Sequence, residues 1–182
     1  MLQSPLRHKF TVEELYRLQE LLQPEQRMEL VCGEIIDMSP INPPHATCVR
    51  KLIRFFQEHL AIEKYVYDVQ NPLKLSDDSL LQPDLVISHL RPGLLENEHI
   101  KAEDVAVLME VADSSYRYDS EDKYALYASA GIPVYVIINL NQRQAEVYTK
   151  PEGNQYTLKQ IATEQFTMLD ILITLDDILP KA

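Results

Sequence analysis

The sequence has few cysteines and no long apolar run, and each shortage excludes a class of protein. Cys32 and Cys48 are the two cysteines among 182 residues, and they match neither a disulfide framework nor the spacing of a zinc site. No apolar run approaches the roughly 20 residues that a membrane-spanning helix needs. Residues 1–5 lack the basic and apolar blocks of a signal peptide. We therefore expect a cytoplasmic protein with reduced thiols and no membrane partner.

Basic side chains are also scarce. The chain has 17 Lys and Arg against 28 Asp and Glu, which gives a formal net charge of -11. Proteins that bind duplex DNA usually carry a basic surface, because much of their affinity comes from neutralising phosphates. Any nucleic-acid site in this chain must therefore be local, or must be completed by bound cations or by a second subunit.

The composition is otherwise that of a globular protein. Apolar residues make up 46% of the chain and charged residues 25%, and the length is sufficient for a hydrophobic core. The chain shows no internal repeat, low-complexity tract or linker. We expect residues 1–182 to form a single domain of the mixed α/β class.

The first third of the chain predicts a helix, a hairpin and a second helix. The segment 11–14, Thr-Val-Glu-Glu, has the form of a capping box and opens a helix that ends before Pro24. Two short extended segments on either side of Gly33 predict a hairpin. From His45 to Leu60, apolar residues recur at helical spacing.

The remainder of the chain is rich in predicted strands. The run 105–111 is apolar apart from Glu110, which indicates a strand buried on both faces. A helix capped by Asp119 or Ser120 is expected to follow it and to end near Gly131. The predicted strands cover 65–71, 72–75, 84–88, 105–111, 134–139, 145–149, 156–161 and 171–175.

Three charged residues stand at the ends of these elements. Asp84 follows a proline at the start of a strand, Glu110 lies near the end of the apolar strand, and Lys123 falls in the first turn of the next helix. Two carboxylates on neighbouring strands can hold a hard cation such as Mg²⁺. A cleft-facing lysine ammonium beside them can stabilise a phosphate or orient a metal-bound water.

Each of the three residues also has a structural interpretation. An aspartate after a proline is commonly a turn residue, as Asp84 would be. Glu110 can reach solvent at the edge of a sheet, although a buried carboxylate without a partner is costly. Lys123 can be a solvated helix residue, although the helix dipole favours anions there. The catalytic interpretation depends on the three occurring together, in this order and on these elements.

A resemblance supports that interpretation. Pro83-Asp84, followed by Glu110-Val111-Ala112, resembles the PD-(D/E)XK signature of restriction-endonuclease-like nucleases, with Ala112 in place of the lysine. Lys123 would then be a migrated lysine, a variation known in that superfamily. More narrowly, the chain is similar to the large bacterial family of restriction endonucleases often called the Uma family. The matching positions are 29–34, 38–40, 45, 82–86, 110–115, 119, 123, 127 and 131–135.

The resemblance implies a fold and a set of metal ligands. The fold would be restriction-endonuclease-like, with a central mixed sheet flanked by helices and preceded by an N-terminal helix and hairpin. Asp84, Glu110 and the backbone carbonyl of Val111 would bind Mg²⁺ or Mn²⁺. Lys123 would contact the scissile phosphate or the attacking water.

The resemblance also implies assisting residues. Glu34 and His45 match family positions near the site and are candidates to assist catalysis, for example through an outer-shell water. Glu29 and Asp119 are weaker candidates. Arg50 and Arg54, one turn apart on the second predicted helix, are candidates for a local phosphate contact, although they also suit a solvated helix face.

The predicted function is metal-dependent hydrolysis of DNA phosphodiester bonds, by a protein expected to act as a homodimer. Two alternatives stay open. One is a non-enzymatic module that keeps the nuclease fold, which the net charge and the strand 134–139 favour. The family usually has Glu and Asp at the two ends of that strand, where this chain has Val134 and Asn139. The other alternative is a metal-dependent hydrolase of smaller phosphoesters.

Overall fold

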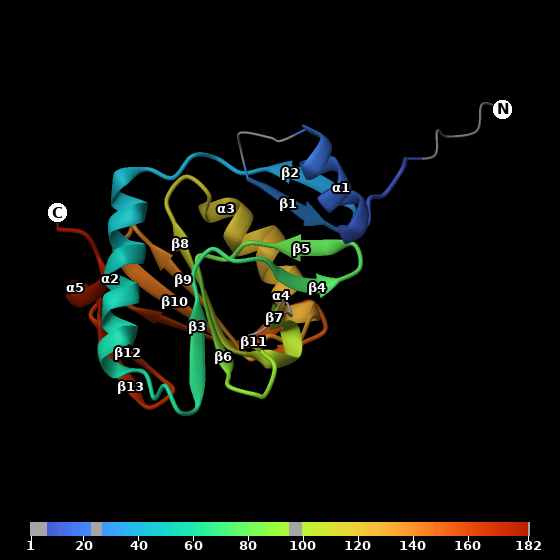
Figure 1. Ribbon diagram of the computed structural model, residues 1–182. Coiled ribbons are helices and arrows are strands. Elements are labelled where there is room, and N and C mark those ends of the chain that lie inside the picture. The colour runs from blue at the N-terminus through green and yellow to red at the C-terminus, as the bar shows by residue number, and fades with distance from the viewer. Residues whose placement is uncertain (1–6, 23–26, 95–99, 182) are drawn as a thin grey trace.

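The computed structural model describes residues 7–22, 27–94 and 100–181, so residues 1–5 and Pro24 lie outside the described residues. A six-stranded sheet, a smaller five-stranded sheet, a two-stranded hairpin and the helices around them build the described part of the chain (Figure 1). The helices are α1 (Val12–Leu22), α2 (Pro43–His59), α3 (Tyr116–Tyr118), α4 (Tyr124–Ser129) and α5 (Leu175–Ile178). The strands are β1 (Met28–Val31), β2 (Glu34–Asp37), β3 (Tyr65–Asp68), β4 (Leu73–Ser76), β5 (Ser79–Leu81), β6 (Leu85–His89), β7 (Ile100–Lys101), β8 (Val105–Ala112), β9 (Val134–Asn139), β10 (Gln144–Glu152), β11 (Gln155–Ala162), β12 (Gln165–Met168) and β13 (Ile171–Thr174).

The larger sheet has six strands in the order β11-β10-β9-β8-β6-β3. The β8–β9 pair is parallel and the other pairs are antiparallel. A parallel pair needs a crossover connection, and the helical segment from α3 to α4 supplies it. All eight residues of β8 are buried, which confirms the prediction of a strand covered on both faces. The mixed α+β class is confirmed as well.

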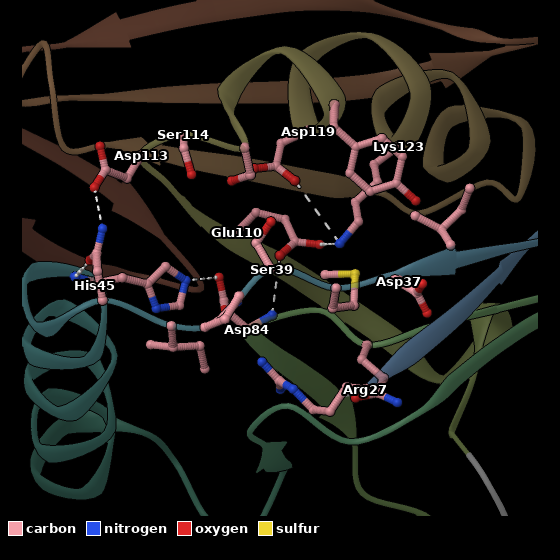
Figure 2. A pocket seen from close by; sticks show the side chains of 18 residues that line it. Arg27, Asp37, Ser39, His45, Asp84, Glu110, Asp113, Ser114, Asp119 and Lys123 are labelled. Carbon is pink, nitrogen blue, oxygen red and sulfur yellow. Dashed lines mark hydrogen bonds and ion pairs between the residues drawn. The ribbon is translucent and has the colours of Figure 1, made fainter. Parts of the chain in front are cut away.

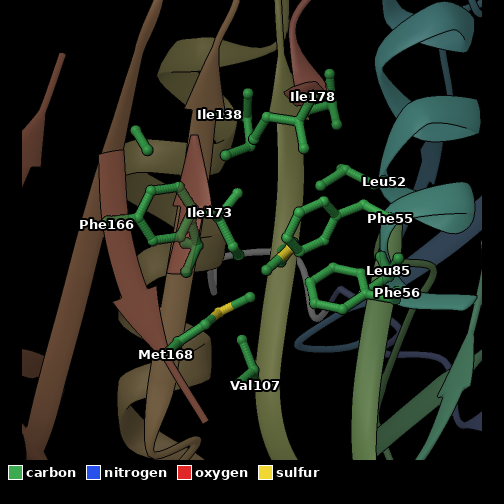
Figure 3. Close-up of a cluster of buried hydrophobic side chains, with 14 of the residues drawn as sticks. Leu52, Phe55, Phe56, Leu85, Val107, Ile138, Phe166, Met168, Ile173 and Ile178 are labelled. Carbon is green, nitrogen blue, oxygen red and sulfur yellow. The ribbon is translucent and has the colours of Figure 1, made fainter. Parts of the chain in front are cut away.

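Alternating residues of this sheet face two different layers. On one face, α2, α5 and the β12–β13 hairpin cover a cluster that includes Leu52, Phe56 and Ile138 (Figure 3). On the other face, the segment from α3 to α4 packs over Leu108 and Tyr135. Glu110 is two residues from Leu108 along β8, so its side chain lies on this second face. Burial of both apolar faces is the main stabilising contribution to the fold.

The smaller sheet, in the order β2-β1-β5-β4-β7, carries α1. Thr11 and Glu14 form the predicted capping box, since each backbone N–H is hydrogen-bonded to the other residue's side chain. The predicted hairpin is present, with Val31 paired to Glu34 beside the turn. Gly33 is required in that turn, because its φ is +80° and a Cβ there would lie 2.6 Å from the Cβ of Lys9.

Two helices start earlier than predicted. The second helix begins at Pro43 rather than His45, because Asn42 caps it by accepting a hydrogen bond from the His45 amide, and proline suits a first helical turn. The helical segment after β8 begins at Tyr116, and its residues Asp119–Lys123 form a π-helical turn between α3 and α4. The expectation that Asp119 caps this segment is therefore wrong. Lys123 lies beyond its first turn.

Candidate active site

Asp84 and Glu110 meet where β6 begins beside β8. Asp84 directly precedes β6, whose first residue, Leu85, pairs with Met109. The Asp84 amide donates a hydrogen bond to Glu110 Oε2 at 3.2 Å. Both side chains border a cavity of about 320 Å³ (Figure 2). The cavity is lined by Arg27, Ile36, Asp37, Met38, Ser39, Pro40, Ile41, Asn42, His45, Gln82, Asp84, Glu110, Asp113, Ser114, Ser115, Tyr118, Asp119 and Lys123.

Asp84 is held by three hydrogen-bond donors. Its Oδ2 lies 2.9 Å from His45 Nε2 and accepts the Val111 amide at 2.9 Å. Its Oδ1 accepts from the Gln70 side chain at 3.0 Å. Burial opposes ionisation of this carboxyl, but the hydrogen bonds and the nearby His45 hold its pKa below the usual value. Asp84 is therefore an ionised and fixed carboxylate. The Val111 N–H contacts it, and the role of the Val111 carbonyl as a metal ligand stays a prediction.

Glu110 is buried and shares its other oxygen with two donors. Its Oε1 accepts from Lys123 Nζ and from the Tyr127 hydroxyl, each at 2.9 Å. Burial raises the pKa of Glu110 well above its usual value, and Asp119 and Asp84 raise it further against the opposing effect of Lys123. Additional positive charge beside Glu110 would favour its ionised form.

Lys123 lines the cavity, as expected of a cleft-facing lysine, but it is also buried, with 2% of its surface exposed, so it is not a solvated helix residue. Its Nζ lies 2.9 Å from Glu110 Oε1, 3.0 Å from Glu29 Oε1 and 4.0 Å from Asp119 Oδ1. The Tyr118 ring centroid is 5.4 Å from the ammonium. Burial alone would lower the pKa of Lys123, but the surrounding carboxylates raise it well above the usual value. Two carboxylates therefore already neutralise the charge of Lys123, the residue expected to contact a phosphate.

Glu29 is more central to the site than the sequence indicated, since the sequence made it only a weaker candidate. It comes from β1 in the smaller sheet and is completely buried. Besides Lys123, it accepts the Gln82 amide at 2.7 Å and the Tyr118 hydroxyl at 3.1 Å. An acidic residue within an otherwise apolar strand was a usable signal, the same one that identified Glu110. Lys123 consequently joins one carboxylate from each sheet.

The other candidate residues divide between the cavity and the surface. His45 lines the cavity, and its Nδ1 is buried without a hydrogen-bond partner in the described part of the chain. Glu34 is exposed beside the hairpin turn and is not among the lining residues. Arg50 and Arg54 are exposed on α2 and bond to their own helix, Arg50 to Thr47 and Arg54 to Glu58.

The residues that differ from the family pattern lie away from the cavity. Val134 is half-buried at the start of β9, and Asn139 is buried at its end. The Asn139 side chain accepts the Gln142 amide at 3.0 Å, so it shapes the turn before β10. Neither residue belongs to the cavity lining. Their substitution therefore leaves the Asp84–Glu110 pair unchanged.

The donor set suits a hard divalent cation. Three carboxylates, those of Glu110, Glu29 and Asp119, surround the Lys123 ammonium, and Asp84 adjoins Glu110, so the cluster has more acidic groups than basic ones. Oxygen ligands and negative charge are what Mg²⁺ and Mn²⁺ prefer. Among residues 7–22, 27–94 and 100–181, no three His, Cys, Asp or Glu side chains are already arranged as a metal site. Asp84 and Glu110 both border the cavity and offer carboxylate oxygens, the type of ligand that such an ion prefers.

The mixed sheet, the aspartate before β6 and the glutamate on β8 define a restriction-endonuclease-like protein. The chain belongs to the Uma2 family, whose model, described as "Putative restriction endonuclease", matches residues 12–177. A crystal structure from Anabaena variabilis ATCC 29413, described as a "putative nuclease belonging to DUF820", is similar in fold. Its TM-score is 0.72 at 14% identity, over 93% of this chain and 97% of that one.

No protein of curated function matches the chain. Within the part of the chain that the structure describes, no helix is long and apolar enough to cross a bilayer.

Proposed function

We propose that this protein is a metal-dependent nuclease that hydrolyses DNA phosphodiester bonds at the Asp84–Glu110 pair. The observation that carries the proposal is the convergence of two carboxylates from neighbouring strands at one cavity, within a cluster whose negative charge exceeds its positive charge. Membership of the Uma2 family supports the nuclease assignment. Mg²⁺ or Mn²⁺ is the proposed cofactor.

Each residue has a definite part in this proposal. A bound divalent ion would supply Lewis acidity and lower the pKa of its water. Asp84 and Glu110 would bind that ion, and the hydrogen bond from His45 keeps Asp84 ionised and oriented. The Lys123 ammonium donates a hydrogen bond to Glu110. Its direct role is therefore to position Glu110 as a metal ligand rather than to contact the phosphate.

The test is cleavage of labelled DNA with Mg²⁺, with Mn²⁺ and with chelator, together with calorimetric titration of Mn²⁺. Asp84→Asn and Glu110→Gln should each lower the cleavage rate by roughly a hundred-fold or more and weaken Mn²⁺ binding, since each removes a charged ligand. Glu58→Gln, on the exposed face of α2, is the matched control. Cleavage that persists in chelator would contradict the proposal.

A non-enzymatic module is the second candidate, favoured by the buried and doubly paired Lys123. A protein of that kind keeps the ion cluster for stability and lacks metal-dependent turnover. The same titration separates the two candidates. Wild-type protein that binds no Mn²⁺ and cleaves no DNA would support the non-enzymatic module.

A further inference from the structure

Arg27 is the cavity residue whose positive charge is available to a ligand. Its half-buried side chain lines the cavity, and it makes no hydrogen bond or ion pair within the described residues. The other lining cation, Lys123, is enclosed by carboxylates, and His45 is hydrogen-bonded to Asp84. The Arg27 carbonyl accepts the Met38 amide at 2.9 Å, which ties its backbone to the segment after β2.

The position of Arg27 suits a phosphate at the acidic pair. Figure 2 shows Asp84 and Glu110 between Arg27 on one side of the cavity and Asp113 and Ser114 on the other. A guanidinium offers a planar fork of donors that matches a phosphate in a bidentate manner. A phosphate that approached Asp84 would therefore find Arg27 on the side of the cavity away from Asp113.

The cavity is small, and a side-chain hydrogen bond joins two of the loops that line it. Its volume of about 320 Å³ is at the lower limit of the roughly 300–1,000 Å³ of pockets that enclose a small molecule. The Asn42 side chain, before α2, donates to Asp113 Oδ2 at 2.6 Å, which links two of the loops that line the cavity. These dimensions leave room for one nucleotide unit rather than for paired strands.

The charge of the cavity lining also favours one nucleotide unit over paired strands. Asp37 and Asp113 add carboxylates to the lining, and the whole chain carries -11. Duplex DNA presents one negative charge for about every 1.7 Å of its axis, so close approach of a duplex brings many uncompensated phosphates. A single phosphate can be compensated by Arg27 and a bound cation. The neutral Ser39 and Ser114 hydroxyls remain for a sugar or an exposed base edge.

We infer that Arg27 is the phosphate-binding residue of this cavity and that the substrate is an unpaired nucleic-acid strand, which enters it one nucleotide at a time. This inference rests on the proposed nuclease function and specifies its substrate class. It also separates Arg27 from the exposed pair Arg50 and Arg54, which lie outside the cavity lining.

The test compares binding of three labelled probes in the presence of Mn²⁺: a single-stranded 12-mer, the same sequence as a blunt duplex, and a trinucleotide. The single strand should bind at least about ten-fold more tightly than the duplex, and the trinucleotide should compete with it. Arg27→Ala should weaken single-strand binding by roughly ten- to a hundred-fold and reduce the salt slope by about one phosphate contact. Arg27→Lys should restore part of the affinity.

Arg50→Ala is the matched control and should change affinity less than about two-fold, since an exposed charge outside the cavity contributes little. Thermal melting of Arg27→Ala checks that the variant is folded. Equal or tighter binding of the duplex would overturn the inference, as would an equal loss in Arg27→Ala and Arg50→Ala. Cleavage, scored separately on gels, reports on the proposed function: single-strand binding without metal-dependent cleavage would reject the nuclease and leave the binding assignment supported.

Discussion

At the scale of single residues, the buried position of Lys123 changes how a variant at this position is interpreted. Loss of cleavage in Lys123→Ala would ordinarily indicate a catalytic lysine. Here the same substitution leaves Glu29 and Glu110 as buried carboxylates without their shared cation. Such a loss must therefore be separated from unfolding before Lys123 is assigned to the chemistry.

We predict that Lys123→Met, which keeps volume and removes charge, lowers the free energy of unfolding by about 3–5 kcal/mol, the usual cost of leaving a buried charge unpaired. Adding Glu29→Gln should recover part of that loss, because it removes one of the two unpaired carboxylates. Urea denaturation measures both. Lys74→Met, in the exposed pair with Asp77, is the control and should cost less than about 1 kcal/mol. A Lys123→Met protein as stable as wild type would refute the buried ion cluster.

Asp119 predicts a pH dependence of stability. Burial raises its pKa to about 6, with Lys123 and Ser115 opposing the rise. Because the folded-state pKa lies above the unfolded value, the folded protein retains the proton longer, and stability falls as pH rises from about 4 to about 6. Asp119→Asn cannot ionise and should lack this loss.

The free energies of unfolding of wild type and Asp119→Asn, measured at pH 4.5 and pH 7.5, test this expectation. The wild type should lose up to about 3 kcal/mol more than the variant over that interval, from about 1.36 kcal/mol per pKa unit. Titrations common to both proteins cancel in the difference. Parallel pH profiles would show that Asp119 is ionised throughout.

At the scale of elements, Asn42 has two separable contacts. Its side chain caps α2 at the His45 amide and bridges to Asp113. Asn42→Ser should keep the cap and lose the bridge, since a serine side chain is too short to reach both, whereas Asn42→Ala should lose both contacts. We expect Asn42→Ala to cost about 1 kcal/mol more than Asn42→Ser, a difference of roughly 2–4 °C in the melting temperature.

Thr11→Ala, which removes the capping box of α1, is the matched control for a cap without a bridge. Equal melting temperatures for Asn42→Ala and Asn42→Ser would show that the cap on α2 contributes nothing. A larger loss in Asn42→Ser than in Asn42→Ala would contradict the assignment of the cap.

Local sequence signals predicted elements better than they predicted irregularities. The capping box at Thr11 and the glycine turn at Gly33 are signals within a few residues, and both features are present. The π-helical turn Asp119–Lys123 has no such signal. It places Lys123 against carboxylates from two sheets, and a turn of this kind commonly occurs at a functional site. The short strand β5 was missed although one of its partners, β4, is its neighbour in the sequence; its other partner, β1, is distant in the sequence.

At the scale of the whole molecule, the sequence brought Asp84 and Glu110 together correctly but could not show what surrounds them. Their pairing follows from two adjacent strands, which hydrophobic pattern predicts. The position of Glu29 depends on how the smaller sheet packs against the helical segment, which no local pattern encodes. The proposed homodimer likewise depends on which surfaces fit together, which no local pattern encodes. Sedimentation at several protein concentrations would test it.

The net charge of -11 predicts that DNA binding depends on a divalent cation. Without metal, Asp84 and Glu110 repel the phosphate, and the field of the whole chain adds to that repulsion. With Mg²⁺ or Mn²⁺, the ion becomes the largest local charge and reverses the sign of the site. Affinity for DNA should therefore appear only with metal, weaken as salt rises, and fall sharply in Asp84→Asn with Glu110→Gln. Anisotropy titrations with metal and with chelator measure it, and equal affinity in the two would count against the metal site.

The ion pairs of Lys123 with Glu29 and Glu110 also constrain how the family can diverge. Because one lysine holds a strand of each sheet, loss of Lys123 leaves two buried carboxylates unpaired and affects folding before it affects chemistry. A descendant released from selection for catalysis would still inherit all three residues, or would have to exchange them together for apolar ones. Retention of this trio among relatives would therefore record the ancestry of the fold, and Asp84 with Arg27 would be the better markers of which lineages still act on a substrate.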